Sequence, residues 1–290
     1  MKKNFFLSSK RKIKSILDIK KQVELIYNYK KYNREYKYHT IYIVAGNRSA
    51  STWLRDLLTH IFVGYNSYHP QNHPSGREGD NYDITLDTIN EYKKRLYVSR
   101  SHTPPKKSNI EIMDKYFKKY LLTIRDPRDV LTSLYLHLKE KKPLGSAFVD
   151  QGLDRELPWK VIDKDFYKLN KKDLISQLIY KVMPGVIEIM EKWLDYSLEN
   201  KNIMVIKYEK LINDPVEEVL KISKFYEKEI KKSKIIKAVE DLNPRQKNSK
   251  FSYFFIGKTG IWKDYLDSQE IDEIEDLSRS FMLKANYKIN

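Results

Sequence analysis

The stretch that decides the fold is residues 40–62, which read TIYIVAGNRSASTWLRDLLTHIF. Residues 41–44 are β-branched or aromatic, which favours a buried strand. After a short loop, apolar residues recur at helical spacing, namely Leu54, Leu57, Leu58, Ile61 and Phe62. The stretch therefore predicts a strand, a loop and a helix.

The loop between this strand and helix combines small residues with donors. Gly46 lets the chain leave the strand sharply, and small side chains let backbone N–H groups approach an anion at the positive end of the helix. Three hydroxyl groups and one fixed charge add donors: Ser49, Ser51, Thr52 and Arg48. The loop therefore favours a phosphate or a sulfate. An ordinary joint whose serines only cap the helix is the alternative.

This loop differs from that of the nucleoside triphosphatases. Their loop reads G-x-x-x-x-G-K-[ST], in which the lysine contacts phosphates and the hydroxyl binds Mg²⁺. The last three positions here are Ser51, Thr52 and Trp53. Because the lysine and the magnesium-binding hydroxyl are both absent, a kinase or a triphosphatase is disfavoured.

Length and composition limit the kinds of protein that this chain can be. With 290 residues the chain can form one large α/β domain with a buried core. The absence of cysteine excludes disulfides, thiolate metal sites and cysteine nucleophiles. No apolar run is long enough for a signal-peptide core or a membrane span, so we expect a soluble, cytoplasmic protein.

Positive charge is concentrated at the N-terminus. The chain has a formal net charge of +16, and residues 1–38 hold 12 Lys and Arg residues against 3 Asp and Glu residues. Apolar residues in 9–29 recur at helical spacing between lysines, which predicts a basic amphipathic helix. We therefore expect a basic helical extension over 1–38 and the main domain over 39–290. The extension either packs on the domain or gives weak contact with an anionic membrane or a nucleic acid, which would make the chain a binding protein.

Two further strands are predicted to end near the loop. Residues 95–99 predict a strand that runs into Arg100-Ser101-His102-Thr103-Pro104, and residues 120–124 predict one that ends at Arg125. Ligands bind at the carboxyl ends of parallel strands, so both ends would face the phosphate loop if the strands are adjacent. A histidine at such a place suits a general base near neutral pH.

A helix is predicted immediately after Arg125. Asp126 is a good N-cap, and Pro127 suits the first helical position. Ser133 lies about two turns into this helix, so Arg125 and Ser133 could reach one phosphate. The alternative is a surface salt-bridge cluster formed by Arg125, Asp126, Arg128 and Asp129.

The remaining chain predicts alternating strands and helices. Further elements are expected at 172–198 (a helix interrupted at Pro184-Gly185), 202–208 (a strand), from 215 onward, 229–240 and 269–284 (helices). This alternation implies a parallel sheet. Residues 64–87 and 139–170 are polar and irregular, and we expect them to shape the acceptor pocket. His69 and His73 are four residues apart, but the intervening and following prolines oppose a helix, so no metal site is predicted.

Taken together, these motifs resemble those of the sulfotransferases that use 3′-phosphoadenosine 5′-phosphosulfate (PAPS). Residues 46–53 are similar to the family's 5′-phosphosulfate loop, and 125–133 to its 3′-phosphate motif. Residues 100–104 resemble the segment of its catalytic histidine, and 205–211 resemble its next strand and turn. Gly257-Lys258-Thr259-Gly260-Ile261-Trp262 resembles the C-terminal loop that folds over the cofactor.

The resemblance implies a single P-loop-like α/β domain with a central parallel sheet flanked by helices. It implies transfer of a sulfonate from PAPS to a hydroxyl or amine of a small-molecule or glycan acceptor, without a metal, leaving adenosine 3′,5′-bisphosphate (PAP). His102 would be the general base, and Arg48 would neutralise the leaving phosphate. The cofactor would contact Arg48, Ser49, Ala50, Ser51, Thr52, Trp53, Arg125, Ser133, Tyr208, Gly257, Lys258, Thr259 and Gly260.

Two departures from the cytosolic branch of this family concern charge. That branch has a lysine at the position of Arg48, whereas a guanidinium stays charged and is not a proton donor near neutral pH. It also has basic residues before the C-terminal loop, where this chain has Phe255 and Ile256. Lys258, Arg245 or Lys247 would then supply the missing charge. The acceptor and the oligomeric state are left open by the sequence.

Overall fold

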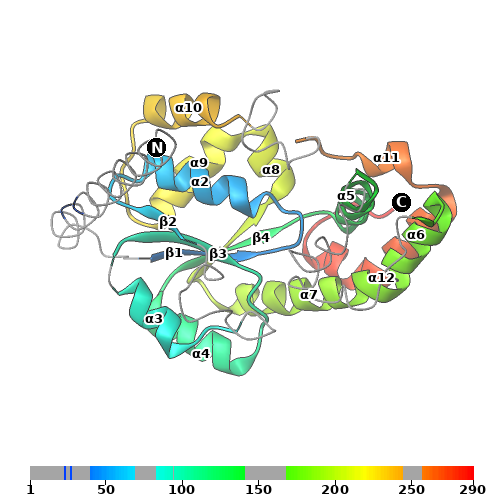
Figure 1. Ribbon diagram of the computed structural model, residues 1–290, viewed down its shortest axis with the longest axis horizontal. Coiled ribbons are helices and arrows are strands. Elements are labelled where there is room, and N and C mark those ends of the chain that lie inside the picture. The colour runs from blue at the N-terminus through cyan, green and yellow to red at the C-terminus, as the bar shows by residue number, and fades with distance from the viewer. Residues whose placement is uncertain are drawn as a thin grey trace, which may run out of the picture.

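A five-stranded parallel sheet is the centre of the fold. The computed structural model describes residues 40–68, 83–93, 95–140, 168–243 and 257–290, with Val23 and Tyr27. The strand order is β2-β3-β1-β4-β5 (Figure 1). The strands are β1 (Thr40–Ala45), β2 (Asn66–Tyr68), β3 (Tyr97–Ser101), β4 (Tyr120–Ile124) and β5 (Ile203–Lys207). All four neighbouring pairs are parallel, which confirms the predicted α/β class.

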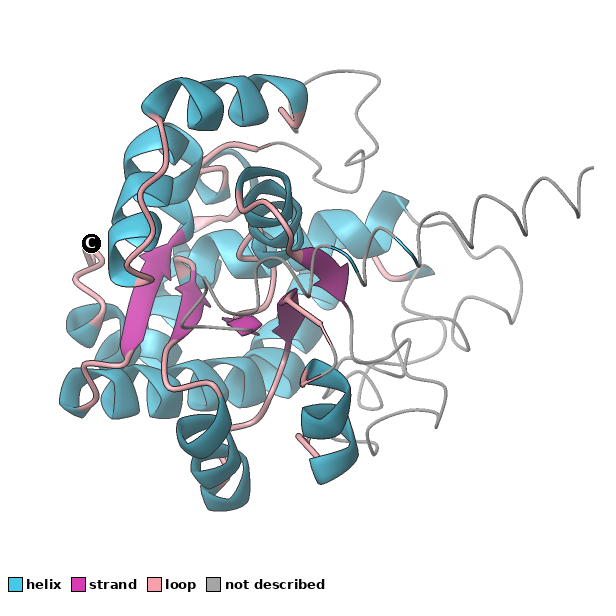
Figure 2. Ribbon diagram, turned by 90° about the vertical axis from the view of Figure 1, so that its left-hand side faces the viewer, coloured by secondary structure: helices cyan, strands magenta, loops and turns pink. Residues whose placement is uncertain are grey.

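Helices cover both faces of this sheet (Figures 1 and 2). Side chains of β1 alternate between the faces, with Ile41 and Ile43 in one core and Tyr42 and Val44 in the other. The first core is completed by α2 (Ser51–Ile61), α8 (Tyr208–Asn213), α9 (Pro215–Phe225) and α10 (Lys232–Asp241). The second is completed by α3 (Leu86–Tyr92), α4 (Lys107–Tyr116), α5 (Pro127–Glu140), α6 (Lys171–Gln177), α7 (Met183–Glu199), α11 (Trp262–Tyr265) and α12 (Ser268–Lys284).

The predicted helix at 172–198 is interrupted earlier than expected. Its irregular part is a π-helical turn at Leu178–Val182, and α7 continues through Pro184. The N–H of Met183 donates to the carbonyl of Leu178, five residues back. Proline has no N–H and its ring clashes with the carbonyl four residues earlier. The wider π-helical turn just before Pro184 makes room for the proline ring and does not require the missing N–H, so the helix can continue through Pro184.

Other element boundaries also differ from the predictions. β2 lies within 64–87, where the composition predicted only a loop. β3 covers Tyr97–Ser101 rather than 95–99, so its last residue directly precedes His102. β5 ends at Lys207, and Tyr208 begins α8 instead of closing the strand.

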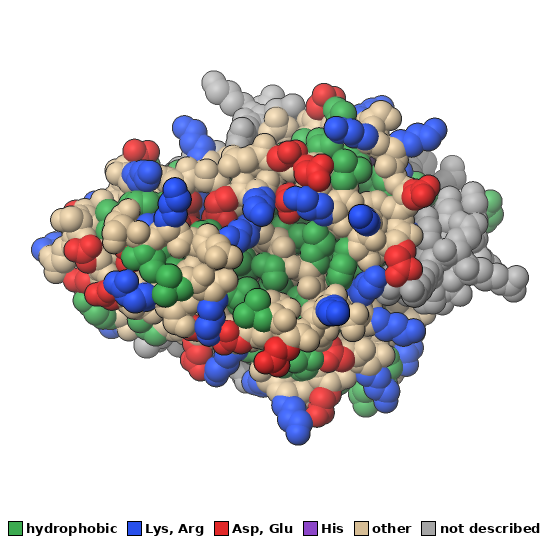
Figure 3. All heavy atoms as spheres, turned by 180° about the vertical axis from the view of Figure 1, so that it is seen from behind, with side chains coloured by type: hydrophobic (Ala, Val, Ile, Leu, Met, Phe, Trp, Pro, Cys, Tyr) green, Lys and Arg blue, Asp and Glu red, His purple; other side chains and the backbone are tan. Residues whose placement is uncertain are grey.

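Several predicted features lie outside the described residues. They include His69, His73, Arg245, Lys247, Phe255, Ile256, nearly all of 1–38 and most of 139–170. Val23 and Tyr27 are helical and exposed, and the anionic contact predicted for the extension stays a prediction. None of the described helices is long and apolar enough to cross a membrane. On the face shown in Figure 3, basic side chains are interspersed with acidic ones.

Candidate active site

The phosphate loop is fixed to β4 at its first residue. The Gly46 N–H donates to the Thr123 carbonyl oxygen at 3.0 Å and lies 3.2 Å from the Thr123 hydroxyl. The Ser49 hydroxyl donates to the Gly46 carbonyl at 2.6 Å and lies 2.7 Å from the same Thr123 hydroxyl. Ser49 is only 1% exposed, so its hydroxyl holds the loop in shape.

This close approach explains why residue 46 is glycine. A Cβ at this position would lie 2.3 Å from the Thr123 carbonyl oxygen and 2.9 Å from Met190 Sδ. We therefore expect Gly46→Ala to lower the free energy of unfolding by about 1 to 3 kcal/mol, measured by urea denaturation. Gly260→Ala is the comparison, because nothing lies within 4 Å of its added Cβ and only its φ of +72° opposes the change. Equal stability of Gly46→Ala and the native chain would contradict this account.

The loop presents uncapped N–H groups at the start of α2. Arg48 has φ 57° and Ala50 has φ 60°, which curls the backbone into the kind of concavity that binds anions. Ala50 is the N-cap, and no side chain bonds to the first turn of α2. The alternative in which the loop serines cap the helix is therefore wrong. The N–H groups of Ser51, Thr52 and Trp53 are at the positive end of the helix, where an anion is favoured.

Arg125 joins the second predicted anion pocket to this loop. Its NH1 donates to the Arg48 carbonyl at 3.0 Å, and its guanidinium carbon lies 3.8 Å from the centre of the Tyr208 ring. Arg48 Nε in turn donates to the Ser133 hydroxyl at 2.9 Å. The structure thus brings Arg48, Arg125, Ser133 and Tyr208 together at the carboxyl edge of the sheet, as predicted.

His102 lies at the same edge. Its Nδ1 is 2.7 Å from the Ala45 carbonyl oxygen, so Nδ1 carries a proton and donates it. Arg100 NH1 lies 3.4 Å from Nε2, a long contact in which Nε2 is the acceptor. The Ala45 contact fixes the tautomer that leaves a lone pair on Nε2.

The residue after His102 anchors the end of β3. Thr103 is fully buried, its hydroxyl lies 2.7 Å from Tyr42 Oη, and its carbonyl accepts from Trp193 Nε1 at 2.8 Å. The sequence did not predict these contacts of Tyr42 and Trp193 with Thr103. Tyr42 is typical of a strand and Trp193 of the buried face of a helix, and neither pattern indicates a hydrogen-bond partner. Both contacts hold His102 in register with the loop.

The charged cluster at the start of α5 is buried. Arg128 donates to Asp126 Oδ2 at 2.7 Å and to Glu275 Oε1 at 2.6 Å, and it lies over the Trp262 ring at 4.2 Å. Asp126 caps α5 as predicted, because its Oδ1 accepts from the Arg128 N–H at 3.0 Å. The alternative of a surface cluster is wrong, since no member is more than 7% exposed.

The C-terminal loop, residues 257–262, lies against Arg125 and α5. The Lys258 carbonyl accepts from Arg125 NH2 and from Tyr208 Oη, each at 3.3 Å. Burial raises the pKa of Tyr208, so its phenol stays protonated and donates. The Lys258 side chain is exposed. Thr259 lies between the Lys258 carbonyl, which contacts Arg125 and Tyr208, and the Gly260 N–H, which contacts Asp129. The loop therefore covers the Arg125 pocket.

Trp53, a predicted site residue, is packed into the hydrophobic core. It is 2% exposed and its Nε1 donates to the Leu242 carbonyl at 2.8 Å, at the end of α10. Its predicted contact with the cofactor stays a prediction. Within the described residues, no group of three or more His, Cys, Asp or Glu side chains could hold a metal.

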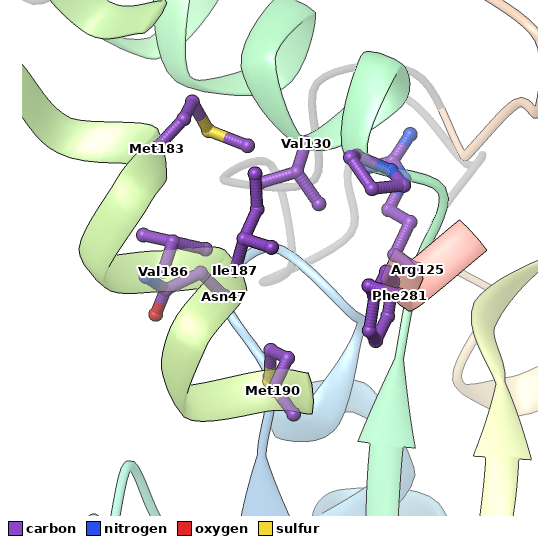
Figure 4. A pocket seen from close by; sticks show the side chains of 10 residues that line it. Asn47, Arg125, Val130, Met183, Val186, Ile187, Met190 and Phe281 are labelled. Atoms are coloured by element: carbon purple, nitrogen blue, oxygen red, sulfur yellow. The ribbon is translucent and has the colours of Figure 1, made fainter. Parts of the chain in front are cut away.

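A mostly apolar pocket adjoins the loop (Figure 4). Residues of α7 form one wall, and Val130 and Phe281 face them from α5 and α12. Polar groups come from Asn47 and Arg125 at the rim of the phosphate loop. The remaining lining residues are Gly46, Pro127, Met183, Val186, Ile187 and Met190.

These features fit a nucleotide with phosphate at both ends. The uncapped start of α2 suits one anion, and the guanidinium of Arg125 suits another. Arg125 Nε is buried and has no hydrogen-bond partner among the described residues, so the side chain retains an unused donor. The donor set consists of backbone N–H, hydroxyl and guanidinium groups, which is the set that phosphate and sulfate require.

Comparison with known proteins agrees with this geometry. The mouse sulfotransferase SULT7A1 complexed with PAP superposes with a TM-score of 0.60 at 14% identity, over 85% of this chain and 84% of that one. A retinol dehydratase in complex with androsterone and PAP gives 0.53 at 17% identity, over 84% and 80%. At such identities these likenesses show the fold, and no curated protein sequence matches the chain. The family model for the sulfotransferase domain matches residues 39–285. The chain therefore belongs to the sulfotransferase domain family.

Proposed function

We propose that this enzyme transfers a sulfonate to a hydroxyl or amine of a small-molecule or glycan acceptor, with His102 as the base. Arg48 stabilises the leaving phosphate in this proposal, and Arg125 with Ser133 holds the 3′-phosphate. The main support is one chain of contacts: His102 bonds to Ala45, and the Arg48 carbonyl three residues later bonds to Arg125. A base and two guanidinium groups therefore share one edge of the sheet.

His102 is suited to take the acceptor proton. Because Nδ1–H is held by the Ala45 carbonyl, the Nε2 lone pair is the acceptor. After accepting the proton the ring is an imidazolium, whose Nδ1–H bond to the carbonyl strengthens. The ring keeps its orientation between the two states, while Arg100 NH1, which lies 3.4 Å from Nε2, has to move aside as Nε2 takes the proton. The acceptor oxygen or nitrogen becomes a stronger nucleophile as its proton moves to Nε2.

Arg48 and the loop are suited to receive negative charge. PAPS supplies the sulfonate and leaves as PAP, so charge develops on the phosphate oxygen that leaves. The positive φ angles of Arg48 and Ala50 hold the loop N–H groups in a fixed concavity, which needs little reorganisation as the charge grows. Arg48 adds a guanidinium that can donate two parallel hydrogen bonds to phosphate oxygens.

The wall beside the loop is mostly apolar, and the space it encloses in this structure holds about one water molecule, so an acceptor there requires the wall to open. Met183, Val186 and Ile187 line this space from α7, and Asn47 supplies a polar group near the loop. The retinol dehydratase structures hold androsterone or retinol, small molecules that combine an apolar frame with oxygen. Of the two acceptor classes, this wall favours a small molecule over a glycan. Sulfonate transfer from labelled PAPS to a panel of hydroxylated apolar compounds, compared with transfer to sugars, tests whether the acceptor is a small molecule or a glycan.

Thermal unfolding with PAP tests the nucleotide site. A ligand present at about 100 times its dissociation constant stabilises the folded state by about 2.7 kcal/mol. We therefore expect a clear rise in melting temperature with PAP and a smaller one with adenosine 5′-phosphate, which lacks the 3′-phosphate. Magnesium and ATP should give no turnover. An unchanged melting temperature with millimolar PAP would overturn the proposal.

A further inference from the structure

Asp129 lies in the first turn of α5, and both of its carboxylate oxygens accept hydrogen bonds from the C-terminal loop. Oδ2 accepts from the Gly260 N–H at 2.8 Å, and Oδ1 accepts from the Trp262 N–H at 3.2 Å. The side chain is 1% exposed. Its two oxygens thus grip two backbone groups of a segment 131 residues further along the chain.

The same carboxylate also belongs to the Arg125 pocket. Asp129 Oδ2 lies 3.7 Å from Arg125 NH2, and that NH2 donates to the Lys258 carbonyl. Residues 258–262 are therefore held at three points, two of them by Asp129 and one by Arg125 together with Tyr208. The loop and the guanidinium are parts of one network.

The charge of Asp129 depends on this docking. Burial raises the pKa of its carboxyl, and Arg125 and the Gly260 and Trp262 N–H groups oppose that shift. If the loop moved away, the carboxylate would lose two of its three favourable neighbours while remaining next to Arg125. In the docked loop the Lys258 carbonyl accepts from Arg125 NH2, so docking of the loop by Asp129 orients the guanidinium that receives the anion.

We propose that Asp129 is a positioning residue that couples docking of residues 257–262 to the Arg125 pocket and thereby sets the preference for 3′-phosphorylated nucleotides. The proposal rests on the proposed function in one respect, the placement of the 3′-phosphate at Arg125. The docking itself does not depend on that placement. Asp129 acts through Arg125 and the loop and does not itself contact the nucleotide.

Asp129→Asn tests the proposal, because it keeps the size of the side chain and removes one acceptor oxygen and the charge. We expect PAP affinity, measured by calorimetry, to fall by about 10- to 100-fold. Affinity for adenosine 5′-phosphate should stay within about twofold. Hydrogen exchange should speed up at the Gly260 and Trp262 amides, because asparagine offers one acceptor oxygen to two N–H groups that each had their own. Asp114→Asn is the control for loss of a hydrogen-bonded carboxylate elsewhere, since Asp114 lies in α4 and accepts from Tyr120 and Tyr196.

A second variant approaches the same contact from the loop. Gly260→Ala strains a residue with φ +72° without touching α5, because no atom lies within 4 Å of the new Cβ. It should weaken PAP by about fivefold and leave adenosine 5′-phosphate unchanged. This variant decides the matter if Asp129→Asn does not fold.

Three results would overturn the inference. They are unchanged PAP affinity in both variants, equal weakening of both nucleotides, and amide exchange at 260 and 262 that stays slow in Asp129→Asn. If the native enzyme binds no PAP, the proposed function fails, while the exchange measurement still decides whether Asp129 holds the loop.

Discussion

His102→Ala is expected to lower kcat by about 10²- to 10⁴-fold, the usual contribution of a positioned general base. The reason is geometric, because the Ala45 carbonyl fixes the Nδ1–H and directs the Nε2 lone pair. Affinity for PAP should change little, since the loop N–H groups and Arg125 that are proposed to hold the phosphates remain in place in this variant. Steady-state sulfonate transfer and PAP calorimetry on the same preparations measure both effects.

His102→Asn separates positioning from proton transfer. An asparagine amide can still donate to the Ala45 carbonyl, but it is not a base at neutral pH. We expect it to be as slow as the alanine variant while keeping the thermal stability of the native enzyme. Substantial turnover in His102→Asn, or parallel loss of PAP affinity and turnover in His102→Ala, would rule out the base role.

Arg48→Ala is expected to lower kcat by about 10²- to 10³-fold, the range found when one preorganised donor to a developing charge is removed. The side chain is half-buried and already oriented by its 2.9 Å bond to the Ser133 hydroxyl. Its effect should fall mainly on kcat, because the charge it meets is largest in the transition state. Initial rates over a range of PAPS concentrations separate kcat from KM.

Two companion variants define what Arg48 contributes. Arg48→Lys keeps the charge but loses the planar fork, so it should recover part of the rate. Ser133→Ala removes the hydroxyl that orients Arg48 and leaves the charge in place, so its loss of kcat should be smaller than that of Arg48→Ala. A kcat in Arg48→Ala equal to that of the native enzyme would exclude charge stabilisation at this position.

Local sequence patterns were sufficient for the parts of the site that form within a short segment. The β1–loop–α2 unit follows from a change of apolar period around Gly46, and the start of α5 follows from Asp126 and Pro127. The position of His102 needed one further assumption, that β1 and β3 are parallel neighbours, and the register confirms it. Arg48 meets Arg125 and Ser133 because β1 and β4 are also parallel neighbours.

The missed features depend on contacts between distant residues. Asp129 looks like an ordinary acidic residue in a first helical turn, and only the folded chain shows that its oxygens bind amides 131 and 133 residues away. Thr123 and Trp193 are equally unremarkable in sequence, although they hold Gly46 and the residue after His102. Tyr208 was expected to end a strand, but α8 begins there. Tyrosine is compatible with both a strand and a helix, so its identity alone does not place this boundary.

The strand order described for the sheet also determines when the enzyme acquires its activity. β1 is the first of the described strands, and it pairs with residues 97–101 and 120–123. The chain therefore has to close long loops, at an entropic cost, before these strand pairings can stabilise it. Ala45 and His102, 57 residues apart, come together only when those loops have closed. Such high contact order makes folding slow. During refolding, recovery of nucleotide binding should therefore follow the appearance of helical signal, and a nascent chain that ends before β4 has no site at all.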